Sequence, residues 1–174
     1  MTNSGRLRVL GIDPGVSETG WAVVEEGPAL LGSGIIRTAA GLPLPDRLLT
    51  IHEGLLRVLR EFRPDSVAVE EMFFLQAAHT VRATLQARGV VLLAARQGGC
   101  PVQEYNPRQV KMTLTGSGAA AKAQMQKMVQ HALRLAEPLR PDDVADAAAI
   151  ALCRLRQNRA KSLRVLGSIG GRGS

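Results

Sequence analysis

Three strand-like segments precede the first helical pattern, and this order constrains the fold of the chain more than any other feature. The segments span residues 7–13, 20–25 and 30–38, and turns containing Gly or Pro separate them. A hairpin meander is therefore predicted at the start of the chain. A helix is predicted next, between Pro45 and Pro64. Its apolar residues recur every three or four positions: Leu48, Ile51, Leu55, Leu59 and Phe62.

The remainder of the chain alternates strands with helices. The pattern predicts a strand over 66–70, a helix over 77–96 and a strand over 101–105. Because a helix separates these two strands, they are expected to pair in parallel. Helical patterns follow over 107–114, 121–135 and 142–157, with a Gly-containing loop at 116–118.

This order of elements indicates an α/β fold, in which a five-stranded mixed sheet is flanked by helices. One domain is expected over residues 1–166, because the chain is long enough for one substantial core. Residues 167–174 are rich in Gly and are predicted to form a disordered tail.

Positive charge is concentrated towards the end of the sequence. Residues 1–103 contain 10 basic and 10 acidic side chains, and residues 104–174 contain 12 basic and 5 acidic ones, so the later part carries the whole net charge of +7. Of the 22 basic residues, 18 are Arg, whose planar fork suits phosphate. This pattern favours a polyanionic partner such as nucleic acid, although acidic lipid or a merely solvated helix end would also produce it.

Apolar stretches in the sequence are all shorter than the roughly 18 residues that a membrane helix requires. The first residues also lack the layout of a signal peptide. We therefore expect a cytoplasmic protein without a membrane partner.

Two predicted strands end in carboxylates. Asp13 ends the first strand, where Pro14 and Gly15 predict a tight turn. Glu70 and Glu71 end the apolar strand that begins at Ser66, and alternation points them to opposite faces of the sheet. Only one of them can join Asp13, and we select Glu70. Each carboxylate also has a simpler interpretation, as a turn residue or as the point where a strand reaches water.

A third group of acids lies at the start of the last predicted helix. Asp142 suits a helix cap, and the helix dipole favours acids in a first turn. Asp143 and Asp146 are three residues apart and therefore share one helical face. Asp146 lies among small residues that must pack closely on the sheet, so its charge requires a cationic partner.

Carboxylates from two strand ends and a helix start, without His or Cys, indicate a site for a hard cation such as Mg²⁺ or Mn²⁺. Such a site can hold two ions about 4 Å apart, one activating water and the other stabilising the leaving oxygen at phosphorus. The pattern therefore predicts phosphodiester hydrolysis.

Six segments in this order, covering residues 8–155, resemble the RuvC family of crossover (Holliday) junction endodeoxyribonucleases. They are LGIDPGVSETGWAVV, LGSGIIRT, VAVEEMFF, QARGVVLLAA, YNPRQVKMTLTGSGAAAKAQMQKMV and DDVADAAAIAL. The resemblance implies a ribonuclease H-like fold and a homodimer that makes symmetric nicks in four-way DNA junctions, leaving 5′-phosphate ends. It also implies two divalent metal ions and, in some members, association with the RuvA–RuvB branch-migration complex.

The resemblance also implies roles for individual residues. The catalytic, metal-binding carboxylates would be Asp13, Glu70, Asp143 and Asp146, with Asp13 touching both metals. Phe73 and Phe74 are adjacent in a chain with only 3% aromatic residues, and the family would stack one of them on an unpaired base. Arg108, Lys111 and Lys122 are expected to contact DNA. The two lysines match family positions near the scissile phosphate, where positive charge offsets that of the transition state.

Three other functions fit parts of the same pattern. The segment from Asp13 to Gly20 also resembles the phosphate-binding hairpin of actin-like ATPases and sugar kinases, although those proteins need two such domains. The shorter YqgF-like nucleases share the acids but are not expected to have the Phe pair. A module that binds junctions without cleaving them would use only the basic part of the chain.

Overall fold

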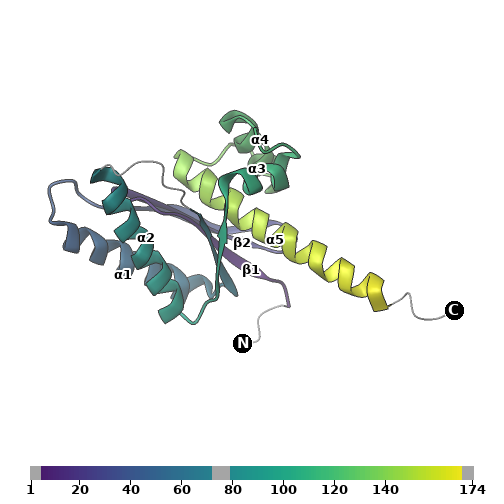
Figure 1. Ribbon diagram of the computed structural model, residues 1–174, viewed down its shortest axis with the longest axis horizontal. Helices are drawn as coiled ribbons and strands as arrows, with labels where there is room; N and C mark the ends of the chain where they lie inside the picture. Colours follow the sequence, from purple (N-terminus) through teal and green to yellow (C-terminus); the bar gives the residue numbers. More distant parts are fainter. Residues whose placement is uncertain (1–4, 72–78, 170–174) are drawn as a thin grey trace.

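A five-stranded mixed sheet forms the middle layer of the structure, a computed structural model that describes residues 5–71 and 79–169 (Figure 1). The sheet order is β3-β2-β1-β4-β5. β1 and β3 pair antiparallel with β2, and β4 pairs in parallel with β1 and β5. The predicted meander and the predicted parallel pairing are both confirmed. The strands are β1 (Arg8–Asp13), β2 (Glu18–Glu25), β3 (Ala29–Arg37), β4 (Ser66–Glu70) and β5 (Val102–Tyr105).

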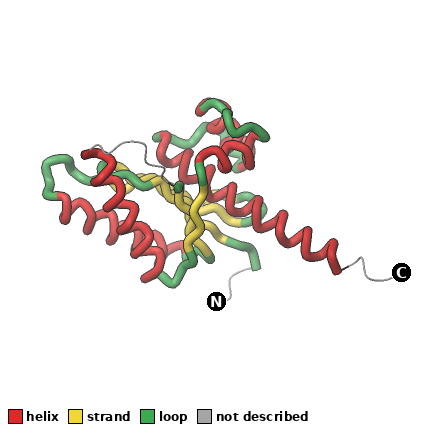
Figure 2. Tube along the Cα trace, in the orientation of Figure 1, coloured by secondary structure: helices red, strands yellow, loops and turns green. Residues whose placement is uncertain are grey.

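Helices cover both faces of this sheet (Figures 1 and 2). α1 (Leu44–Phe62) and α2 (His79–Gln97) pack together on one face. α5 (Asp142–Ile169) crosses the other face, and α3 (Pro107–Thr115) and α4 (Lys122–Ala132) pack beside its first half. The chain therefore has three layers, with the ends of β1 and β4 directed towards the start of α5.

Side chains alternate between the two faces along each central strand, and this alternation builds two cores. On the α1–α2 side, Leu10, Ile12 and Val23 are fully or almost fully buried. On the α5 side, Val9 and Ala22 are fully buried against the small residues of that helix. Residues at odd positions of β1, including Asp13, therefore belong to the α5 face.

Two glycines allow α5 to lie unusually close to the sheet. A Cβ atom at Gly11 would overlap the backbone oxygen of Ala147, and one at Gly20 would overlap the backbone oxygen of Asp143. Any larger residue at either position would push the helix away. The start of α5 thus rests directly on β1 and β2, beside the end of β1.

α5 differs from its predicted extent. The expected end near Gln157 is wrong, because the helix continues to Ile169. The intervening residues include helix formers and contain neither Gly nor Pro before Gly167. Residues 167–169, assigned to a disordered tail by the sequence, form the last helical turn, and 170–174 lie outside the described residues. None of the described helices combines the length and the apolar character that crossing a bilayer requires.

Candidate active site

Asp13 and Glu70 occupy neighbouring ends of two parallel strands. Ile12 pairs with Val69 in the sheet, so the next residues along, Asp13 and Glu70, are also level with one another. Residues that are level on adjacent strands point to the same face. Both carboxylates therefore lie on the α5 face, as the choice of Glu70 over Glu71 requires.

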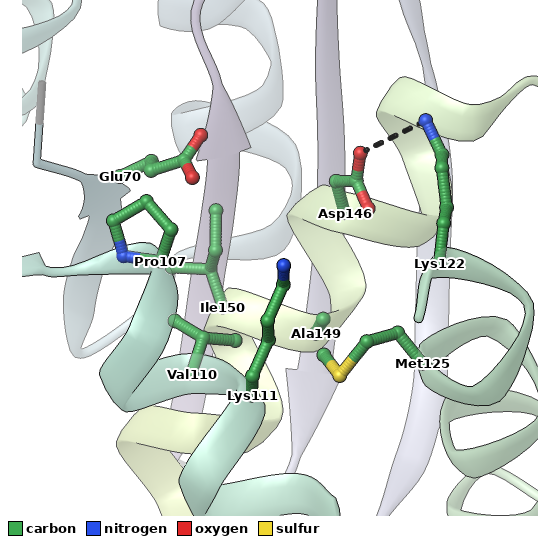
Figure 3. A pocket seen from close by; sticks show the side chains of 9 residues that line it. All are labelled: Glu70, Pro107, Val110, Lys111, Lys122, Met125, Asp146, Ala149 and Ile150. Carbon is green, nitrogen blue, oxygen red and sulfur yellow. Dashed lines mark ion pairs between the residues drawn. The ribbon is translucent and has the colours of Figure 1, made fainter. Parts of the chain in front are cut away.

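Asp143 and Asp146 reach the same region from the first turns of α5. The backbone of Asp143 lies against Gly20, and Gly20 pairs with Asp13 in the sheet. Asp146 lies one turn further along α5 and lines a pocket together with Glu70 (Figure 3). The structure thus gathers four acids, which come from three separate parts of the sequence, at one end of the sheet.

The electrostatics of these acids reflect their proximity. The pKa of Asp13 is raised from 3.8 to about 7, mainly by burial and then by the negative charges of Glu70, Asp146 and Asp143. Burial and then the charge of Asp146 raise the pKa of Glu70. Burial is also the largest cause of the raised pKa of Asp146. Because Coulomb interactions decay with distance and are screened by solvent, the effect of these three acids on Asp13 agrees with their position at one end of the sheet.

A pocket of about 240 Å³ lies beside the acids, and two lysines border it. Figure 3 shows Lys111 of α3 pointing into the space between Glu70 and Asp146, and Lys122 of α4 directed at Asp146. The Lys122 ammonium is 3.7 Å from a carboxylate oxygen of Asp146. Lys111 lowers the pKa of Glu70, opposing its burial. The apolar floor is formed by Val110, Met125, Ala149 and Ile150.

Two further acids, Glu18 and Asp142, belong to this region and were not predicted as site residues from the sequence. The charge of Glu18 adds to the effect of burial in raising the pKa of Asp143. Asp142, which the sequence suggested as a helix cap, instead directs both carboxylate oxygens to side chains of α4, Gln126 and Lys122. No local motif marks these residues, because their contacts depend on how separate elements pack.

The remaining DNA-contact candidates lie around this pocket or outside the described residues. Arg108 is exposed in the first turn of α3, and its side chain packs over Gly118 in the Gly-containing loop. Phe73 and Phe74 lie outside the described residues. Within the basic end of the chain, Arg156 donates to the backbone oxygens of Thr113 and Leu114 at the end of α3. That arginine therefore has a structural role, so the charge excess is not wholly available to a polyanion.

Comparison with known proteins decides the family. The profile described as "Crossover junction endodeoxyribonuclease RuvC" matches residues 9–154. The chain belongs to the RuvC family. A RuvC from Chloroflexus aurantiacus is 49% identical over 150 residues, which cover 84% of this chain and 92% of that protein.

Solved structures of the RuvC family agree with this assignment. The RuvC structure from Thermus thermophilus superposes with a TM-score of 0.82 at 40% identity, covering 89% of this chain and 97% of the other. A second structure, T. thermophilus RuvC in complex with a Holliday junction substrate, has a TM-score of 0.82 and 39% identity. The match covers 88% of this chain and 96% of that one. The predicted ribonuclease H-like α/β fold is confirmed. The match to the RuvC family includes the Asp13 turn, so the ATPase interpretation of that turn is not needed.

The acids of this RuvC family member fit a divalent cation chemically. Their donors are all carboxylate oxygens, which Mg²⁺ and Mn²⁺ prefer. Burial and the neighbouring carboxylates outweigh Lys122 in setting the pKa of Asp13, which is therefore raised. Among the residues that the structure describes, no three acidic, His or Cys side chains converge closely enough to enclose an ion. Like charges repel, so we expect such a cluster to close fully only around a cation.

The raised pKa of Asp13 predicts how pH changes the stability of the metal-free protein. With a folded-state pKa of about 7, Asp13 holds its proton more tightly in the folded than in the unfolded chain, so stability falls as pH rises from about 4 to about 7. Asp13→Asn removes this penalty. The difference in free energy of unfolding between Asp13→Asn and the unsubstituted protein should therefore grow in favour of the variant by roughly 1–3 kcal/mol between pH 5 and pH 8.

Urea unfolding with a chelator present measures this difference. Asp46→Asn, which changes an exposed acid in the first turn of α1, is the matched control and should show no such growth. An Asp13→Asn advantage that stays the same at both pH values would show that Asp13 is not protonated near neutrality.

Proposed function

We propose that this chain is a Holliday junction resolvase, an endonuclease that depends on divalent metal and makes symmetric paired nicks in four-way DNA junctions. The observation that carries the proposal is the gathering of four carboxylates beside two lysines, in a member of the RuvC family. Recombination and DNA repair are the processes that require such nicks. The nicks leave 5′-phosphate and 3′-hydroxyl ends, which a ligase can rejoin.

In this proposal Asp13, Glu70, Asp143 and Asp146 are the residues that would hold two Mg²⁺ or Mn²⁺ ions, with Asp13 as their common ligand. Ions held there would supply an activated water for attack and positive charge for the leaving 3′-oxygen. Asp13 suits the shared position because it is the acid on which Glu70, Asp143 and Asp146 all act. A water oxygen forms the new bond to phosphorus, the bond to the 3′-oxygen breaks, and that oxygen takes up a proton.

Basic and aromatic side chains contact the DNA in this proposal. Lys111 and Lys122 border the pocket, where their ammonium groups can offset the additional negative charge of the transition state. Arg108 contacts the DNA backbone from the exposed start of α3. Phe73 and Phe74 follow Glu70 by three and four residues, and one ring stacks on an unpaired base at the junction centre.

The chain acts as a homodimer, since paired nicks require two active sites. α2 offers a suitable surface, because Leu85 and Leu93 are 39% and 54% exposed and lie on one helical face. Gly89 lies between them, and open space above it leaves room for a close helix–helix contact. This apolar stripe, Leu85–Gly89–Leu93, would pair with its copy about a two-fold axis.

Leu93→Lys is expected to abolish this dimer, because it places a charge in the centre of an apolar interface. Sedimentation at micromolar concentration should then show the mass of one chain instead of two. Leu42→Lys changes a leucine of similar exposure before α1 and should leave the dimer intact. Persistence of the dimer in Leu93→Lys would place the interface elsewhere.

The cellular location and one partner complete the proposal, and both rest on family resemblance. The protein works in the cytoplasm, and it can receive junctions from the RuvA–RuvB branch-migration complex. Pull-down of purified RuvA–RuvB on a junction, with and without this chain, would test the association with that complex.

Incubation of an end-labelled four-way junction with the protein and Mn²⁺ tests the proposed activity. A resolvase produces nicks at symmetric positions in two strands of like polarity, and ligase then seals the products. A stable gel shift without cleavage would support the non-catalytic junction-binding module instead. Cleavage of linear duplex at an equal rate would contradict junction specificity.

A further inference from the structure

Asp142 joins the starts of α4 and α5 through both of its carboxylate oxygens. Oδ1 accepts a hydrogen bond from Gln126 Nε2 at 2.7 Å, and Oδ2 lies 3.0 Å from Lys122 Nζ. Lys122 and Gln126 are four residues apart on α4 and so share one face of that helix. One carboxylate thereby contacts two side chains of the neighbouring helix.

Lys122 lies between this carboxylate and the acid cluster. Its ammonium is closer to Asp142, at 3.0 Å, than to Asp146, at 3.7 Å. The Lys122 side chain is 56% exposed, and its stem has several rotatable bonds, so little else restrains the charged end. Ion pairs this exposed contribute little to stability, and the consequence of the contact is therefore mainly the orientation of Lys122.

We propose that Asp142 is a positioning residue, which with Gln126 holds the ammonium of Lys122 at the edge of the carboxylate cluster. The inference rests on the proposed role of Lys122 beside the scissile phosphate. Asp142 binds the ammonium from outside the set of residues that line the pocket, whereas Asp146 is one of the lining residues. Without Asp142 the ammonium would lose its nearer partner and sample positions away from the phosphate.

A double-mutant cycle tests whether Asp142 acts through Lys122. Asp142→Asn keeps the size of the side chain and an acceptor for Gln126, and should slow single-turnover junction cleavage about tenfold. Lys122→Met should slow it about 100-fold, within the range for loss of one transition-state contact. In the Lys122→Met background, Asp142→Asn should cause no further loss. Asp142→Ser, which keeps a helix-capping oxygen, should behave like Asp142→Asn.

Controls separate positioning from a general effect on the fold or on the charge. Glu137→Gln removes an exposed acid from the connection between α4 and α5, and should leave the rate unchanged. Thermal midpoints should remain close to that of the unsubstituted protein in all variants, and so should the junction affinity of the variants at Asp142 and Glu137. If Asp142→Asn lowers the cleavage rate equally in the unsubstituted protein and in Lys122→Met, or lowers it in neither, the inference is overturned.

A second readout does not depend on cleavage. The chain has four lysines, at 111, 122, 127 and 161, so labelling lysine Cε with ¹³C gives four NMR signals. In Asp142→Asn without metal, the Lys122 signal should move towards the position of a free lysine, while those of Lys111 and Lys127 stay. An unmoved Lys122 signal would contradict the positioning role. Absence of cleavage by the unsubstituted protein would instead reject the proposed function.

Discussion

Asp13→Asn is expected to lower junction cleavage by at least about 1,000-fold while the protein still binds the junction. Asp13 ends the central strand β1, and three other acids of the cluster influence its carboxylate. Amide nitrogen cannot ligate a cation, and the neutral side chain removes charge from the proposed shared position. A loss of several kcal/mol of transition-state stabilisation corresponds to this factor.

Single-turnover cleavage with Mn²⁺, together with junction affinity measured in Ca²⁺, separates chemistry from binding. The matched control is again Asp46→Asn, which should cleave at the normal rate because Asp46 lies in the exposed first turn of α1. Cleavage by Asp13→Asn within tenfold of the unsubstituted protein would show that Asp13 is not a metal ligand in the reaction.

Gly20→Ala is expected to damage both stability and activity, although it adds only one methyl group and changes no charge. The added Cβ would overlap the backbone oxygen of Asp143, and its separation from the Asp143 Cβ would be only 2.8 Å. α5 must therefore shift. Overpacking of this kind costs about 1–3 kcal/mol, or roughly 2–10 °C in thermal midpoint for a chain of this size.

The shift of α5 should also reduce cleavage about 100-fold, since small displacements of positioned groups have effects of this order. Gly41→Ala provides the control, because a Cβ at Gly41 meets no atom within 4 Å. A Gly20→Ala protein with normal stability and normal cleavage would show that the close approach of α5 to β2 is dispensable.

Much of this arrangement follows from local patterns in the sequence. Apolar runs identify β1 and β4, and parallel pairing of neighbouring strands brings Asp13 and Glu70 to the same edge. The spacing of Asp143 and Asp146 predicts one helical face. These inferences succeed because strand and helix periodicities determine which side chains share a face.

Other features depend on how distant elements pack, and the sequence pattern does not reveal them. The contact of Asp142 with Lys122 and Gln126 requires that α4 and α5 begin side by side. The proximity of Glu18 to Asp143 depends on the position of α5 across β2. The sequence also misplaces the end of α5, because Arg159, Lys161 and Arg164 interrupt the apolar periodicity that marks a buried helix.

Anomalous diffraction from crystals soaked in Mn²⁺ tests directly whether the four carboxylates bind two metal ions. We expect two peaks about 4 Å apart, with an oxygen of Asp13 bound to each and with Glu70, Asp143 and Asp146 completing the coordination. Crystals in which Mn²⁺ binds elsewhere on the protein, leaving these four carboxylates without a metal, would contradict it.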